Sequence, residues 1–270
     1  FGGFDVPIEV QKALTSANEK LRRSTREKNL VSGFGYNDYM AYHYAFMMKV
    51  ATVREPETFS EAAKDPRWIK AMNKEMQALH KNETWDLVPT SPHKKAIGCR
   101  WIFKVKYNAD GSVNHYKARL VAKGYAQTHE VDYEETFAPV AKMMTVWTVI
   151  ALAAAKGWHL HQMDVQNAFL QGELEEKVYM VQPLGFNSST HPKVVCRLKK
   201  PVYSLKQAPR AWHSKITQYL HQIGFHMSKL DNSLYIRSGS ESPIVIILYV
   251  DDLVIGGEHL VEINKVKSLL

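Results

Sequence analysis

Apolar residues recur at helical spacing through residues 57–85, and the pattern falls into two pieces. The stripe of the second piece consists of Trp68, Ile69, Met72, Met76 and Leu79. Pro66 stands at the start of this piece, where proline is well tolerated in a helix. The pattern therefore predicts a short helix followed by a longer one.

An alternating pattern rich in β-forming residues follows at 99–107 and returns at 113–123, with the turn sequence NADG between them. This predicts a β-hairpin. It carries five basic residues: Lys104, Lys106, Lys117, Arg119 and Lys123. Residues of equal parity share a face of a strand, so the first two lie together and so do the last three. Such a face is either a solvated basic surface or a clamp for phosphates, and the hairpin alone leaves both open.

The second half of the chain alternates between helical and extended patterns. Helices are predicted at 142–157, 208–225 and 259–270, with a helix or turn at 167–176. Strands are predicted at 158–166, 177–183, 194–205, 231–238, 243–250 and 253–257. Helices mixed with antiparallel strands in this order predict an α+β fold.

Composition and charge limit the kinds of protein that this chain can be. The chain has 270 residues, 45% of them hydrophobic, and no apolar stretch long enough for a membrane span. The net charge of +8 suits a polyanionic partner such as nucleic acid, although a basic protein without such a partner fits equally well. Residues 1–54 lack a steady period and are predicted to form a linker or extended arm. The two cysteines, Cys99 and Cys196, indicate free thiols in a reducing compartment.

Candidate chemistry lies in three aspartates. Asp251 and Asp252 interrupt the apolar run IILYVDDLVIGG at a predicted hairpin tip, and Asp164 lies on an earlier strand. If these strands are neighbours, three carboxylates converge and repel each other. Mg²⁺ relieves this repulsion, since it binds one or two carboxylates and completes its shell with water and phosphate oxygens. The alternative is a solvated turn, because adjacent aspartates are common in turns.

Several longer motifs are a more specific signal than the three aspartates. The segments KARLVAKGYAQTHEVDYEETFAPVAKM, HQMDVQNAFLQGELEEKVYMVQPLGF, YSLKQAPRAW and YVDDLVIGG occur in this order. Together with RWIKAMNKEMQALHKNETWDLVP they resemble the reverse transcriptase of copia-type LTR retrotransposons over about 55–270. The resemblance implies the fingers and palm of a right-hand polymerase, with an antiparallel sheet and packed helices. It also implies that 1–54 is the linker that follows the integrase.

The resemblance assigns roles to individual residues. Asp164, Asp251 and Asp252 would be the catalytic, metal-binding aspartates, with Asp251 the more direct ligand of the pair and the Val165 carbonyl assisting. Phe169 would block a ribose 2′-hydroxyl, although it also fits a core aromatic. Contacts to nucleotide or template would come from Lys104, Lys106, Lys117, Arg119, Tyr203, Lys206, Gln207 and Arg210.

Cofactors and partners follow from the same resemblance. It implies two Mg²⁺ ions, with Mn²⁺ as an alternative, an RNA template, a DNA primer and deoxynucleoside triphosphates. It further implies integrase and ribonuclease H parts in the same polyprotein, no membrane association, and a cytoplasmic particle or the nucleus as the location.

Three departures from the family pattern limit what is carried over. Ser204 replaces the glycine of the family's YGLKQ and is expected to crowd the nucleotide site. Trp147 replaces an arginine, which removes a charge and requires a large ring to be packed. The chain ends at Leu270, where the family continues into a thumb and ribonuclease H. The alternatives are therefore a truncated remnant that binds nucleic acid or metal without polymerising, and a Mg²⁺-dependent phosphohydrolase.

Overall fold

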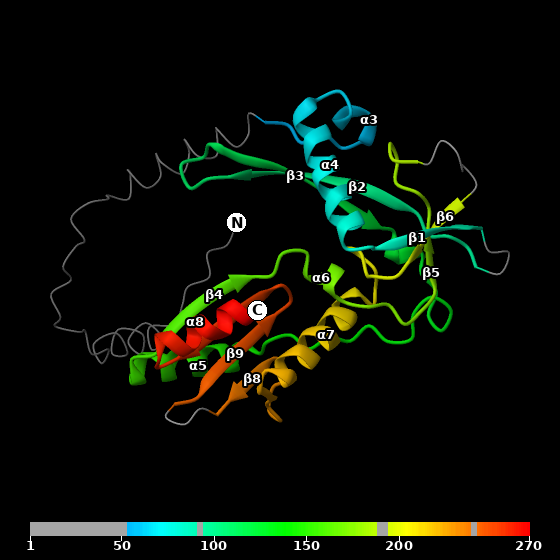
Figure 1. The fold of residues 1–270 in the computed structure, drawn as a ribbon. Coiled ribbons are helices and arrows are strands. Elements are labelled where there is room, and N and C mark those ends of the chain that lie inside the picture. The colour runs from blue at the N-terminus through cyan, green and yellow to red at the C-terminus, as the bar shows by residue number, and fades with distance from the viewer. Residues whose placement is uncertain (1–52, 91–93, 188–193, 239–241) are drawn as a thin grey trace, which may run out of the picture. The chain divides into compact units, whose positions relative to one another are not determined.

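The computed structural model describes residues 53–90, 94–187, 194–238 and 242–270 (Figure 1). The predicted linker at 1–54 lies almost wholly outside the described residues. The described part combines helices with antiparallel sheets, as the α+β prediction required. Within these ranges, no helix is both long and apolar enough to cross a bilayer.

The first layer is a two-stranded hairpin covered by a helix. Strands β2 (Cys99–Tyr107) and β3 (Val113–Ala122) pair as the predicted hairpin, and helix α4 (Pro66–Lys81) packs against β3. The short helix α3 (Phe59–Ala62) precedes α4, so both predicted helices are present. The buried side chains between helix and hairpin include Trp68, Met72, Met76, Trp101, Phe103, Ala118 and Leu120. One face of the hairpin is therefore apolar and covered, which leaves the basic face on the other side.

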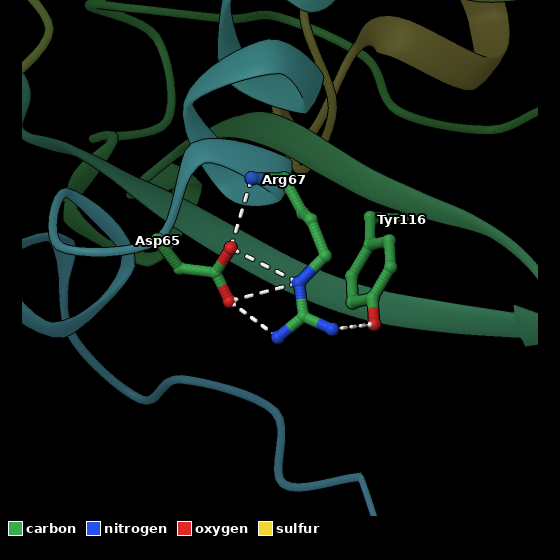
Figure 2. A network of polar contacts seen from close by, with 3 residues as sticks. All are labelled: Asp65, Arg67 and Tyr116. Atoms are coloured by element: carbon green, nitrogen blue, oxygen red, sulfur yellow. Dashed lines mark hydrogen bonds and ion pairs between the residues drawn. The ribbon is translucent and has the colours of Figure 1, made fainter.

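Three side chains fasten the start of α4 to the hairpin (Figure 2). Asp65 caps the helix, because its carboxylate accepts a hydrogen bond of 2.8 Å from the backbone N–H of Arg67. The guanidinium of Arg67 donates to the same carboxylate and, at 2.7 Å, to the hydroxyl of Tyr116 on β3. The hydrogen bonds from Arg67 hold the pKa of Asp65 below its usual range. The cap therefore fixes both the first residue of α4 and the position of the helix on β3.

A second, three-stranded sheet has the order β1 (Trp85–Pro89), β6 (Val194–Leu198), β5 (Val178–Met180). Strands β5 and β6 were predicted, but β6 ends at Leu198, well short of the predicted 205. Strand β1 was not predicted, since its five residues end in a proline and carry no alternation that stands out. Its register with β6 places Leu87 opposite Cys196. Both cysteines are free thiols, and burial raises the pKa of Cys99 to about 11 and that of Cys196 to about 12.

The third sheet carries the aspartates. Its order is β4 (His159–Asp164), β10 (Asp252–Gly257), β9 (Ile244–Tyr249), β8 (Leu234–Arg237), β7 (His226–Met227). Residues 244–248 of β9 are buried on both faces, which explains the unbroken apolar run there. One face packs with α7 (Ala208–Gln222) and α8 (Leu260–Leu269), and the other packs with α5 (Met143–Lys156). Figure 1 shows these helices gathered around β9.

Helix α5 is fastened to the sheet by Asp231, which lies in the loop before β8. Its carboxylate accepts hydrogen bonds from the backbone N–H of Lys142 at 3.1 Å and the hydroxyl of Thr145 at 2.5 Å. It also accepts two from Ser233, at 3.0 Å from the N–H and 2.7 Å from the hydroxyl. Burial alone would raise the pKa of Asp231, but these hydrogen bonds lower it to about 2. Asp231 supplies the cap that the sequence of α5 itself lacks.

The expectation that Trp147 must be packed is wrong. Its ring, on α5, is 61% exposed. Only Val149 and Ala153 of this helix are buried, because α5 meets the sheet along a narrow stripe. Met143, Met144 and Ile150 are exposed beside Trp147, so the outward face of α5 is apolar.

Replacing Asp231 by asparagine is expected to make the free energy of unfolding vary less with pH in the acid range. The pKa of Asp231 is lowered on folding, from an ordinary 3.8 to about 2. Its ionised form therefore contributes stability that is present above pH 4 and is lost as the pH falls toward 2. Asp231→Asn should lower the free energy of unfolding at pH 7 by about 2 kcal/mol, and the difference should vanish near pH 2. Urea unfolding at several pH values measures this.

The matched control for this prediction is Asp110→Asn. Asp110 accepts the same pair of hydrogen bonds from Ser112 that Asp231 accepts from Ser233, but in an exposed turn. This substitution should cost well under about 1 kcal/mol. Equal losses for the two variants would contradict the role given to Asp231.

Candidate active site

Two strands from distant parts of the sequence bring the predicted aspartates together. Strands β4 and β10 are antiparallel neighbours, and their register places Asp164 directly opposite Asp252. Directly opposed residues project from the same face of a sheet. Met163 and Leu253 form the adjacent pair and pack toward α7 and α8, so the two aspartates project from the other face.

The turn that carries Asp251 is held from two sides. The backbone N–H of Val165, just after β4, donates to the carbonyl oxygen of Asp251 at 2.8 Å. The indole N–H of Trp212 on α7 donates to the carbonyl oxygen of Val250 at 2.6 Å. Val250 has a φ of 55°, which is strained for a β-branched residue. Both ends of the turn are therefore fixed in a conformation that the isolated sequence would disfavour.

The carboxylates lie at the surface, although two of them interrupt an apolar run that is largely buried. Asp164 is exposed, while Asp251 and Asp252 are half-buried. Gln162 donates a hydrogen bond of 3.0 Å from its amide nitrogen to Asp252 Oδ1. Asp252 is thus partly satisfied by its own sheet, whereas Asp164 and Asp251 both line an open cleft.

This cleft lies between the helix–hairpin layer and the end of β4. It has a volume of about 350 Å³. Facing the two aspartates across it are Lys117 and Arg119 of β3 and Glu75 of α4. Burial, with Arg119 and Lys106 nearby, lowers the pKa of Lys117. Carboxylates on one side and cations on the other give a site suited to a ligand with both metal and phosphate.

Glu75 occupies the edge of the hairpin. Its Oε1 accepts a hydrogen bond of 3.2 Å from the N–H of Leu120, a group that an edge strand would otherwise leave unpaired. Burial raises the pKa of Glu75, although this hydrogen bond and the charges of Arg119 and Lys117 oppose the shift.

The basic face of the hairpin forms as predicted. Lys104 lies opposite Lys117, and Ile102 lies opposite Arg119, so these cations share one face. With Lys106 they line a second hollow of about 210 Å³ next to the first. The parity argument placed Lys123 on this face with Lys117 and Arg119. That placement is wrong, because β3 ends at Ala122 and Lys123 lies beyond it. Opposed like charges are unfavourable without an anion, and Glu55 supplies one for the Lys104–Lys117 pair.

Lys104 is the one cation of this face that has an acidic partner among the described ion pairs. Glu55 Oε2 lies 2.5 Å from Lys104 Nζ, and Glu55 Oε1 accepts from the N–H of Val105. Burial would raise the pKa of Glu55, but these hydrogen bonds lower it below its usual value. Lys106, Lys117 and Arg119 remain to meet a ligand's charge.

Tyr203 lies where the two hollows meet, and Ser204 lines the second of them. The N–H of Ala122 donates to the carbonyl oxygen of Tyr203 at 3.0 Å, which extends the hairpin into this segment. Ser204 has a φ of 67°, a conformation that favours glycine. Its carbonyl oxygen packs on Gly124, where a Cβ would come within 1.9 Å. Gly124 is therefore required for this close approach.

A buried polar network fixes the segment that follows. Gln127 donates to Gln207 Oε1 at 3.0 Å and accepts from the N–H of Lys206 at 2.9 Å. Gln207 in turn donates to the carbonyl oxygen of Asp132 at 3.0 Å and is 1% exposed. Its amide oxygen and its amide nitrogen each have a partner inside the protein. The network ties the 203–207 segment to the loop after the hairpin.

Two predicted contact residues point elsewhere. Arg210 on α7 lies 3.7 Å from a carboxylate oxygen of Glu135 and 3.9 Å from one of Glu176, and it lines a hollow away from the aspartates. Lys206 Nζ lies 3.1 Å from the hydroxyl of Tyr133 and over its ring. Their contacts with nucleotide or template stay predictions.

Comparison with known proteins places this geometry in a family. The family model for "Reverse transcriptase (RNA-dependent DNA polymerase)" matches residues 82–270. The chain belongs to the reverse transcriptase family. It is 49% identical, over 79% of its length, to the retrovirus-related Pol polyprotein from transposon RE1 of Arabidopsis thaliana. It is 37% identical, over 93% of its length, to the corresponding polyprotein from transposon TNT 1-94 of Nicotiana tabacum.

These relatives are much longer than the chain. The matches span 15% of the RE1 polyprotein and 19% of the TNT 1-94 polyprotein. The domain is therefore a copia-type reverse transcriptase domain that corresponds to one section of such polyproteins.

A divalent metal fits the reverse transcriptase cleft by the chemistry of its donors. Among the described residues, no three His, Cys, Asp or Glu side chains are already gathered as a metal cage. Mg²⁺ does not need one, since it binds through one or two carboxylates and takes its other ligands from water and substrate phosphates. Asp164 and Asp251 supply the two carboxylates on one cleft, with Val165 beside them.

Some residues of this site were missed from the sequence. Glu75 could have been found, because it lies between Met72 and Met76 on the apolar stripe of α4 and a carboxylate there needs a partner. Gln127 carries no such signal. Its importance arises from contacts with residues 79 and 80 positions away.

Ser204→Gly is expected to stabilise the domain. A non-glycine residue at positive φ carries strain of about 1 kcal/mol or more, which glycine removes at a smaller entropic cost. The free energy of unfolding should rise by up to about 1 kcal/mol in urea titration. Gly124→Ala, which forces a Cβ into the carbonyl oxygen of Ser204, should lower it instead. A loss of stability in Ser204→Gly would contradict the strain argument.

Gln127→Leu is expected to destabilise the domain by about 2–3 kcal/mol, because the buried Gln207 Oε1 and the half-buried N–H of Lys206 lose their partner. Thermal and urea unfolding measure the loss. Asn82→Leu is the matched control, since this half-buried amide donates one described hydrogen bond, to the carbonyl oxygen of Ala78. It should cost about 1 kcal/mol, and an equal loss in both variants would remove the special role of the network.

Proposed function

We propose that this domain is an RNA-directed DNA polymerase that joins a deoxynucleotide to a primer 3′-hydroxyl. The observation that carries the proposal is the β4–β10 register, which sets Asp164 beside the Asp251–Asp252 turn and opposite the cations of β3. In this assignment α4 with the β2–β3 hairpin are the fingers, and the five-stranded sheet with α5, α7 and α8 is the palm.

The cations would bind the triphosphate. Lys106, Lys117 and Arg119 project from one face of the hairpin, and Lys117 and Arg119 line the cleft that holds the aspartates. Arg119 offers a planar fork for phosphate oxygens, and Lys117 offers a compact charge. The lowered pKa of Lys117 reflects burial and its cationic neighbours, and a bound triphosphate would remove that repulsion.

The carboxylates would hold two divalent ions. Asp164 and Asp251 are the proposed ligands, with the Val165 carbonyl assisting and Asp252 held by Gln162 as their support. When bound, such ions neutralise the developing charge of phosphoryl transfer on the attacking and leaving oxygens. The domain's own contribution is to orient the triphosphate between carboxylates and cations, which is the main requirement for this reaction.

Partners follow from the same charges. The net charge of +8 and the basic hairpin suit a polyanion, and we propose an RNA template with a DNA primer. Since the matched relatives are Pol polyproteins, we propose that the domain works as the polymerase section of a protein of that kind.

Primer extension tests the proposal. With Mg²⁺ and a primed RNA template, the chain should add deoxynucleotides, and Asp251→Asn should reduce the rate by at least about 100-fold because a metal ligand is lost. Asp86→Asn is the matched control: Asp86 pairs with Arg197 and Lys199 on the three-stranded sheet and should leave the rate unchanged. The rate of primer extension should also fall as the salt concentration rises.

Two outcomes would contradict the proposal in different ways. Salt-sensitive binding to an RNA–DNA hybrid without extension would indicate a remnant that binds but does not polymerise. Release of phosphate from nucleotides without extension would indicate a phosphohydrolase that uses the same carboxylates.

A further inference from the structure

The hairpin turn that carries Asp251 contains a residue poorly suited to it. The turn between β9 and β10 consists of Val250 and Asp251, and of these two only Val250 has a positive φ, of 55°. This is the pattern of a type II′ turn, in which the first central residue is normally glycine. Valine is β-branched and is therefore strained at this φ. Its side chain is 37% exposed, so packing does not hold it there.

A hydrogen bond from α7 holds the turn instead. The indole N–H of Trp212 donates at 2.6 Å to the carbonyl oxygen of Val250. That carbonyl belongs to the peptide between Val250 and Asp251, so the bond fixes the orientation of this peptide and, with it, the type of turn. Without the bond, Val250 would return to a negative φ and form a type I or II turn. Such a turn fits the twist of a hairpin less well and would redirect Asp251.

Trp212 is itself fixed in place. It is 4% exposed and belongs to the buried stripe of α7. The chain leaves the short helix α6 (Ala168–Gln171) at Gly172, where a Cβ would come within 3.0 Å of the backbone nitrogen of Trp212. Phe169 of α6 packs on the hydrophobic cluster that contains Trp212. The indole N–H is therefore a donor with a fixed position.

Strand β4 holds the turn from the other side. The N–H of Val165 donates to the carbonyl oxygen of Asp251 at 2.8 Å, and the register pairs Asp252 with Asp164. These contacts do not involve the peptide before Asp251, which Trp212 holds. Trp212 is not among the described residues that line the cleft of the aspartates. It therefore acts on the site through the backbone of the turn and not by touching a ligand.

We propose that Trp212 is a positioning residue, whose indole N–H selects the turn conformation that directs Asp251 into the cleft beside Asp164. The consequence for catalysis rests on the proposed polymerase function. The conformation of the turn does not, because the contacts that set it lie within the chain itself.

Two other tryptophans provide matched controls. The indole N–H of Trp101, on β2, donates to the carbonyl oxygen of Leu184 at 3.1 Å, so this residue makes the same kind of bond at another place. The indole nitrogen of Trp158 is buried and has no hydrogen-bond partner among the described residues. Replacing each by phenylalanine removes an N–H that does not hold the turn.

Amide hydrogen exchange in the metal-free chain tests the conformation of the turn directly. Trp212→Phe keeps an aromatic ring in the core and removes the N–H. The amides of residues 250–253 should then exchange at least about 10-fold faster, because a hydrogen bond that restrains the turn is lost. Trp101→Phe and Trp158→Phe should leave the exchange of these amides within about 2-fold of wild type.

Val250→Gly tests whether Trp212 acts through the turn. Glycine adopts a positive φ without strain, so the turn keeps its form in this variant without the bond from α7. In the presence of dATP, Trp212→Phe should weaken Mn²⁺ binding by at least about 10-fold in the parent chain. In the Val250→Gly background it should weaken binding by no more than about 3-fold. The kcat of primer extension should follow the same pattern, with the KM for the primed template unchanged.

The outcomes separate this inference from the proposed function and from a general loss of stability. Trp101→Phe also loses a hydrogen bond, yet should retain wild-type Mn²⁺ binding. Wild-type exchange of the turn amides in Trp212→Phe, or an equal loss of Mn²⁺ affinity with and without Val250→Gly, would overturn the inference and leave the polymerase intact. Failure of the wild-type chain to extend a primer would overturn the proposed function, while the exchange measurement would still decide the role of Trp212.

Discussion

The antiparallel pairing of β4 with β10 is the constraint on which the rest of the site depends. It sets Asp164 opposite Asp252, and the N–H of Val165 fixes the carbonyl oxygen of Asp251 next to them. A slip of one residue would send one aspartate to the face covered by α7 and α8. The Leu253–Met163 pair opposes that slip, because both side chains are held in the core on that face. Hydrophobic packing therefore determines where the carboxylates lie.

The opposite wall is positioned by polar contacts as well as by packing. Helix α4 covers the apolar face of the hairpin, so Lys106, Lys117 and Arg119 project from the other face. The Gln127–Gln207 network then joins the segment of Tyr203 to the end of that hairpin. Buried amides of this kind are costly when broken, which restricts the segment to one arrangement. Carboxylates from the sheet and cations from the hairpin meet at one cleft as a result.

Local periodicity predicted the local features of the sequence well. The alternation of β2 and β3 and the unbroken apolar run of β9 have the predicted form, because each is set by neighbours in sequence. The stripe of α4 also forms, except that Ile69 is exposed. Strand β1 was not predicted, since a five-residue edge strand carries little periodic signal. Trp147 was misjudged because family position says little about how a side chain packs in this chain. The role of Gln127 depends on contacts far away in sequence, which no local pattern contains.

Metal binding tests the central claim most directly, since it requires the two strands to bring their carboxylates to one point. Mn²⁺ binding can be followed by electron paramagnetic resonance in the presence of dATP, for the wild-type chain and for Asp164→Asn, Asp251→Asn and the distant Asp86→Asn. We expect both cleft variants to weaken Mn²⁺ binding by at least about 10-fold and Asp86→Asn to match the wild type. Wild-type Mn²⁺ affinity in Asp164→Asn would contradict the account.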